Sequence, residues 1–139
     1  MFHHILVPTD LTERSLKALD VALGMTTPTR GQITLLHVIE TIEDADVDEF
    51  GDFYRQLENR AREKMEQVAL KVLEHQPVIR KEIIYGKRVI EIVRFAEDRG
   101  VDLIVLSSHR VERESGPHAW GTISYKVGIL SHCPVMLVK

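Results

Sequence analysis

Five short apolar runs, spread along the whole chain, constrain its fold more than any other feature of the sequence. They are His4–Pro8, Gln32–Ile39, Val78–Tyr85, Asp102–Leu106 and Pro134–Val138. Short apolar runs that end in turn residues are typical of β-strands. The second run is continuous in Ile, Leu and Val, which is typical of a strand covered on both faces. The runs therefore predict strands of a buried sheet.

Between these runs, apolar residues recur at helical spacing. The helical segments contain Leu16, Leu19, Ala22 and Leu23, then Phe53 to about His75, Val89 to Ala96, and Gly121 to Leu130. Thr12 is placed to cap the first helix, and Gly100 is placed to end the third in the C′ position. Strands that alternate with helices predict a parallel sheet with right-handed crossovers. We therefore predict that residues 1–139 form a single α/β domain. Its open, five-stranded parallel sheet would have the order 3-2-1-4-5 and carry helices on both faces, a Rossmann-like fold.

Polar residues follow the first and fourth strands, where this strand order places a ligand crevice. Pro8-Thr9-Asp10 ends the first strand, and Ser107-Ser108-His109-Arg110 follows the fourth. Gly121-Thr122 then opens the last helix. Free backbone N–H groups and the helix dipole attract an anion at such a position. The sequence therefore predicts a site for a phosphate-bearing ligand at this edge of the sheet.

Composition excludes several classes of partner. A formal net charge of -3 argues against nucleic acid, because a phosphate backbone requires a concentrated basic face. The one cysteine, Cys133, cannot form an internal disulfide, which fits a reducing compartment. No apolar run approaches the roughly 20 residues that span a bilayer, and no signal-peptide pattern precedes His4. We expect a soluble, cytoplasmic protein that binds neither nucleic acid nor membranes.

No catalytic motif stands out in the chain. It contains no Gly-x-Ser-x-Gly elbow, no Gly-x4-Gly-Lys-Ser/Thr loop and no His-Glu-x2-His. Its seven histidines include no His-x3-His pair, and no cysteine cluster accompanies them. His37, in the second strand, is expected to be a hydrogen-bonded core histidine. The sequence thus favours a binding protein over an enzyme.

Several segments, taken together in order and spacing, resemble the universal stress protein family. They are Ile5–Asp10, Leu35–Val38, Val101–Leu106, Gly121-Thr122 with Val127, and His132–Val135. The resemblance covers essentially the whole chain. It implies an α/β domain that usually dimerises and acts in a stress response. One branch of the family binds ATP through a Gly-x2-Gly-x9-Gly-Ser/Thr motif.

This chain departs from that motif on the phosphate side. Ser107 and Arg110 occupy the first two glycine positions, and ten residues rather than nine separate Arg110 from Gly121. Gly121-Thr122 matches the final pair. The resemblance implies that Asp10 contacts the nucleotide and that the Val38 backbone contacts adenine. The adenosine side of the site is therefore kept, while the phosphate side is altered.

Two of these residues have two interpretations each. Asp10 either begins a turn or caps the next helix, or it contacts a nucleotide and a phosphate-bound Mg2+. Arg110 either replaces lost N–H contacts to phosphate or fills an emptied pocket. The sequence favours a regulatory module that responds to ATP or AMP. The alternatives are a protein-interaction module that has lost nucleotide binding, and a slow ATPase switch.

The last strand, Pro134–Val138, lies at a sheet edge in the predicted order and carries no charge before Lys139. An unprotected apolar edge is a template for pairing with another chain. We therefore predict a homodimer in which this strand pairs with its own copy about a two-fold axis. A monomer whose edge is shielded by residues 111–119 is the alternative. The sequence does not name a downstream protein partner.

Overall fold

The computed structural model of the chain describes residues 2–27, 30–41, 50–71, 78–108 and 122–139. Its elements in order are β1 (His4–Pro8), α1 (Glu13–Met25), β2 (Gln32–Glu40), α2 (Gly51–Lys71), β3 (Val78–Gly86), α3 (Arg88–Asp98), β4 (Leu103–Ser107), α4 (Thr122–Leu130) and β5 (Val135–Val138). The strands form one sheet of order β3-β2-β1-β4-β5, and each neighbouring pair is parallel. The predicted α/β fold and strand order are confirmed.

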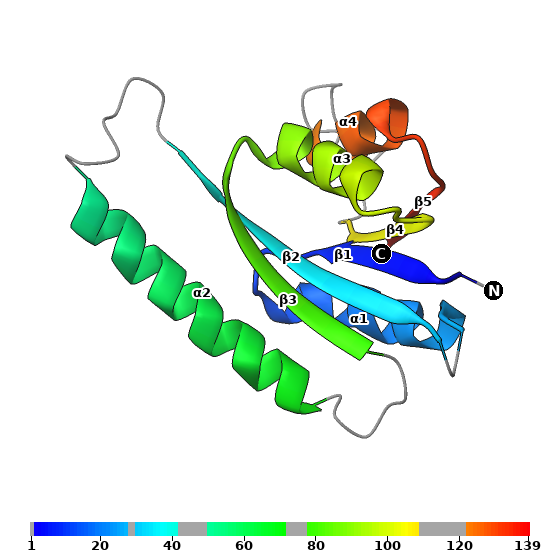
Figure 1. Cartoon of the computed structure of the whole chain (residues 1–139), viewed down its shortest axis with the longest axis horizontal. Helices are drawn as coiled ribbons and strands as arrows, with labels where there is room; N and C mark the ends of the chain where they lie inside the picture. The colour runs from blue at the N-terminus through cyan, green and yellow to red at the C-terminus, as the bar shows by residue number, and fades with distance from the viewer. Residues whose placement is uncertain (1, 28–29, 42–49, 72–77, 109–121) are drawn as a thin grey trace.

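Helices cover both faces of the sheet, as Figure 1 shows: α1 and α2 lie on one face, and α3 and α4 on the other. Successive strand residues point to opposite faces, so each strand contributes to two cores. In β1, Ile5 and Val7 pack with Leu19 of α1 and Met65 of α2. Leu6, between them, packs against the α3 and α4 side of the sheet. This two-sided burial explains why the strands read as continuous apolar runs.

Two strands begin one residue later than predicted. Asp102 stands before β4 because its carboxylate accepts the backbone N–H groups of His3 and His4, both at 2.9 Å. It therefore ties β4 to the start of β1. Pro134 stands before β5 because it has no N–H to give to a ladder, although its carbonyl accepts the Ile104 N–H at 3.0 Å.

Gly100 ends α3 as predicted. Its φ is +65°, in the left-handed region, and the N–H of Val101 donates to the carbonyl of Ala96 at 3.0 Å. This is the long bond of a Schellman motif. The predicted end of the second helix near His75 lies outside the described residues. No helix in the described part of the chain is both long and apolar enough to cross a membrane.

Gly31, which is buried immediately before β2, is expected to be intolerant of any side chain. A Cβ there would lie 2.0 Å from Thr26 Oγ1 and 2.4 Å from the Thr27 carbonyl oxygen. Gly31→Ala should therefore lower the free energy of unfolding by about 1–3 kcal/mol in urea denaturation, since backbone must move. Gly24→Ala, where a Cβ meets nothing within 4 Å in α1, should raise it by about 0.5 kcal/mol. Equal effects of the two changes would contradict this account.

Candidate functional site

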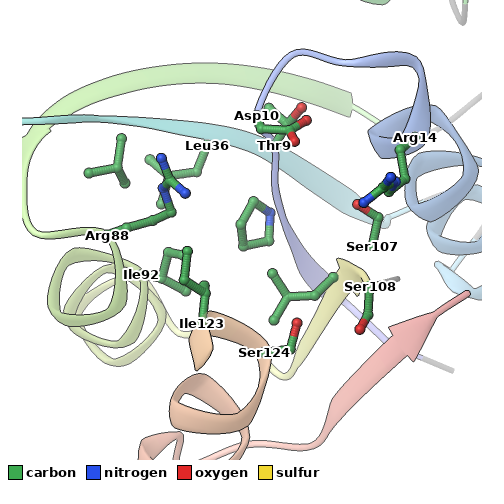
Figure 2. Close-up of a pocket in the computed structure, with 13 residues that line it drawn as sticks. Thr9, Asp10, Arg14, Leu36, Arg88, Ile92, Ser107, Ser108, Ile123 and Ser124 are labelled. Atoms are coloured by element: carbon green, nitrogen blue, oxygen red, sulfur yellow. The ribbon is translucent and has the colours of Figure 1, made fainter. Parts of the chain in front are cut away.

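A cavity of about 290 Å3 lies beside the carboxyl ends of β1, β2 and β4, where the strand order reverses (Figure 2). One part of its lining is apolar: Pro8, Leu36, Val38, Ile92, Leu106 and Ile123. The other part is polar: Thr9, Asp10, Arg14, Arg88, Ser107, Ser108 and Ser124. A mostly apolar hollow with a few convergent polar groups is typical of a small-molecule site.

The structure brings together most of the residues predicted from the sequence. Pro8, Thr9, Asp10, Val38, Ser107 and Ser108 all line the cavity. They meet because the carboxyl ends of parallel strands lie at the same edge of the sheet. His109, Arg110 and Gly121 lie outside the described residues, and Thr122 is the first residue of α4.

Asp10 organises the turn between β1 and α1. Its Oδ1 accepts the N–H of Thr12 at 3.0 Å, the hydroxyl of Thr12 at 2.5 Å and the hydroxyl of Ser15 at 2.7 Å. Leu11, inside this turn, has a φ of +67°, which is unfavourable for a residue with a side chain. The hydrogen bonds around Asp10 hold the backbone in that conformation. Oδ1 of Asp10 therefore stabilises the turn, which is the first of the two interpretations of this residue.

Thr12 corrects the sequence analysis in one respect. It occupies the N-cap position of α1, but its side chain makes no capping hydrogen bond. Its hydroxyl donates to Asp10 instead. A capping bond would need Thr12 Oγ1 to accept a backbone N–H of the first turn, whereas the hydroxyl is turned toward the carboxylate of Asp10, which is a strong acceptor.

The charge of Asp10 is also set by this turn. Burial raises the pKa of its carboxyl, but hydrogen bonds from the Thr12 and Ser15 side chains and from backbone N–H groups outweigh burial. The net pKa is lowered from its ordinary value. Asp10 therefore carries a full negative charge at neutral pH. Its Oδ2 has no hydrogen-bond partner among the described residues, and Asp10 is one of the residues that line the cavity.

Two further contacts fix the floor of the site. His37 Nδ1 donates to the Thr9 carbonyl at 2.8 Å and supports the β1–α1 turn. His37 is hydrogen-bonded as predicted, but it is half-buried rather than a core residue. The Ser108 N–H donates to the Val138 carbonyl at 2.7 Å, which ties the end of β4 to the end of β5. These bonds leave the loop backbone little freedom at the point where Ser107 faces the cavity.

Among the described residues, sequence reasoning missed two arginines of the cavity lining, Arg14 and Arg88. Arg14 lies in the first turn of α1 and Arg88 is the first residue of α3. Both follow strands whose ends lie at this edge of the sheet. Their place in the chain was the signal that could have identified them. Each lies at the start of a helix, and that helix start faces the same crevice as the strand end before it. Ser124 and the apolar Ile92 and Ile123 were also missed, since they reach the cavity only through the packing of α3 and α4.

No group of three or more His, Cys, Asp or Glu side chains could hold a metal ion within the part of the chain that the structure describes. Asp10 is the one acidic residue among the described residues that line the cavity. A divalent cation would therefore need most of its oxygen ligands from a bound phosphate.

Comparison with known proteins places this fold in a family. The sequence profile of the Universal stress protein family matches residues 1–139. The chain is 30% identical to the universal stress protein YxiE of Bacillus subtilis, over 100% of both chains. It is also 30% identical to the universal stress protein MJ0577 of Methanocaldococcus jannaschii, over 100% of this chain and 96% of the relative.

Solved structures agree with the sequence comparison. The structure of MJ0577 superposes with a TM-score of 0.85 at 32% identity and covers 100% of this chain and 96% of its own. A universal stress protein family member of Arabidopsis thaliana, solved with AMP bound, has a TM-score of 0.68 at 19% identity, over 99% and 91% of the two chains. By profile, sequence identity and fold, the chain belongs to the universal stress protein family.

Proposed function

We propose that this protein is a regulatory module of the stress response that binds an adenine nucleotide, ATP or AMP, in the cavity at the ends of β1, β2 and β4. The observation that carries the proposal is the cavity itself, in which an apolar wall faces a polar rim at the switch point of the sheet. The related Arabidopsis protein solved with AMP makes adenine nucleotides the first ligands to test.

The ligand would lie with its adenosine against β1 and β2. The Val38 backbone would contact adenine, and Asp10 Oδ2 would accept a ribose hydroxyl. Support comes from the position of both residues in the cavity lining and from the ionised state of Asp10. The phosphates would face the segment Ser107 to Arg110 and the helix start at Gly121-Thr122. A Mg2+ ion would bridge Asp10 and phosphate oxygens.

ATP and AMP are expected to bind with affinities within roughly tenfold of each other, about 1.4 kcal/mol. The reason is that Ser107 adds a Cβ where glycine would let the backbone close on the outer phosphates. Isothermal titration calorimetry of each nucleotide against the purified protein measures the ratio. A thousandfold preference for ATP would contradict this placement of the phosphates.

The same samples separate the two alternatives from the proposal. If neither nucleotide binds, the protein is an interaction module whose cavity has lost its ligand. If ATP binds and phosphate is released at a rate that falls in Asp10→Asn, the protein is a slow ATPase switch. Among the described residues of the lining, Asp10 is the candidate base for an attacking water, and its lowered pKa makes it a weak base, so we expect binding without turnover.

We also propose a homodimer formed through β5. This strand lies at the sheet edge, and Leu137 in it is exposed. On α4, which packs beside β5, the side chains of Tyr125, Ile129 and Leu130 are exposed as well. Exposed apolar side chains on and beside an unpaired edge strand are typical of a pairing surface. The two copies would pair their β5 strands antiparallel about a two-fold axis.

A cytoplasmic location fits the chemistry of Cys133. Burial raises the pKa of this thiol, with a smaller contribution from Asp102, and its backbone hydrogen bond only partly offsets the rise. A thiol of raised pKa is a poor nucleophile and resists oxidation. We place the protein in a reducing compartment because its sequence has one cysteine and therefore no internal disulfide, and there it would act on a downstream protein partner still to be identified.

A further inference from the structure

The two arginines that line the cavity in the described part of the chain, Arg14 and Arg88, lie at opposite ends of it. Figure 2 shows Arg14 reaching from α1 toward Ser107, whereas Arg88 lies on the far side, next to Leu36 and Ile92. The cavity is thus lined by cations at both ends, but the two ends differ in what surrounds each cation. Hydroxyl groups accompany Arg14, and aliphatic side chains accompany Arg88.

The two cations also differ in their charge balance. Arg88 has a counter-ion: its Nε lies 4.0 Å from Glu40 Oε1, and its backbone N–H lies 3.4 Å from the same oxygen. Arg14 has no ion pair with any carboxylate in the described residues. Asp10, the acidic residue of the lining, directs Oδ1 to Thr12 and Ser15 instead. Among the described residues, Arg14 is therefore the arginine of the lining without an ion pair, and it shares the cavity with the carboxylate of Asp10.

The position of Arg14 is fixed by the turn that precedes it. Asp10 binds Thr12 and Ser15, the residues on either side of the Glu13–Arg14 pair, and so anchors the first turn of α1. A guanidinium on an anchored backbone loses less freedom when it binds than one on a free loop. Its planar fork of N–H donors also matches phosphate oxygens better than an ammonium does.

We propose that Arg14 binds the phosphate nearest the ribose and makes the site selective for phosphorylated nucleotides over nucleosides. This inference rests on the proposed nucleotide function and adds to it the residue that recognises the anion. Arg14 with the Ser107 hydroxyl supplies donors where a glycine loop would supply backbone N–H groups. At the other end Glu40 balances the charge of Arg88 and the wall is aliphatic, so this end receives the base.

The test compares AMP with adenosine by calorimetry, in the wild type, Arg14→Gln and Lys17→Gln. Lys17 lies about one turn further along α1, is exposed and does not line the cavity, so its change removes the same charge elsewhere. Arg14→Gln should weaken AMP binding roughly 10- to 100-fold, as expected for a charged hydrogen bond, and change adenosine binding less than about twofold. Lys17→Gln should change neither by more than about twofold.

Each outcome decides the proposal. If Arg14→Gln and Lys17→Gln affect AMP equally, or if Arg14→Gln weakens adenosine as much as AMP, Arg14 is not the phosphate-binding residue, although the nucleotide function stands. If the wild type binds neither ligand, both proposals fail. Arg14 is exposed, so the variant should melt within about 2 °C of the wild type. Arg14→Lys, which keeps the charge but not the fork, should recover part of the lost AMP affinity.

Discussion

Replacing Leu137 with lysine is expected to turn a folded homodimer into a folded monomer, with the mass measured by light scattering falling by about half. Leu137 is 40% exposed on β5, the edge strand through which we propose that two copies pair. The two-fold axis would bring the two introduced ammonium groups into one interface, away from water and near each other. An inward charge on an edge strand is also how natural sheets prevent edge-to-edge pairing.

A matched substitution away from β5 shows whether loss of the dimer is specific to this edge strand. Leu70, on α2, is 65% exposed and lies away from β5, so Leu70→Lys should leave the mass unchanged. Both variants should retain the circular dichroism spectrum of the wild type. A wild type that is monomeric at tens of micromolar would contradict the proposed dimer, as would a Leu137→Lys protein that stays dimeric.

The largest expected loss of stability comes from truncating Ile104. This side chain is 0% exposed, in β4 between β1 and β5, and packs with Leu6, Phe95 and Val127. Ile104→Ala should lower the free energy of unfolding by about 2–5 kcal/mol, because a cavity remains where the chain cannot collapse. Urea denaturation followed by circular dichroism measures the change.

The control is the same substitution at an exposed site. Ile90 of α3 is 47% exposed, and alanine favours a helix more than isoleucine does. Ile90→Ala should change the free energy of unfolding by less than about 1 kcal/mol. If the two variants were equally destabilised, the described packing of the core on the α3 and α4 face would be wrong.

The fold could be predicted from the sequence because its main signals are redundant. Buried parallel strands read as continuous apolar runs, and the alternation with helices leaves few topologies. Boundaries were less predictable where one residue makes a tertiary contact. Asp102 looks like the first residue of a strand, but the backbone N–H groups of His3 and His4, distant in sequence, engage its carboxylate. No local pattern encodes such a contact.

The residues of the site likewise fall into those that the sequence could predict and those that it could not. Asp10 and Ser107 could be predicted to lie in the cavity lining because the topology fixes where strand ends meet, and Val38 because of the family resemblance. Arg14 and Arg88 could not, because a helix residue faces the cavity or the solvent according to the rotation of its helix on the sheet. Thr12 was expected to accept a backbone N–H of α1, but its hydroxyl is turned toward Asp10, and residue type alone does not fix that orientation.

The central claim, that the cavity binds an adenine nucleotide, is tested most directly by calorimetry of AMP against the wild type and Ser107→Phe. Ser107 lines the cavity at the end of β4, where an aromatic residue suits the strand and would fill the space. Gln67→Phe, on the exposed face of α2, adds the same ring away from the cavity. The account predicts one AMP per chain for the wild type and Gln67→Phe, and no binding for Ser107→Phe. A wild type that binds no AMP, or a Ser107→Phe protein that binds it as well as the wild type, would contradict it.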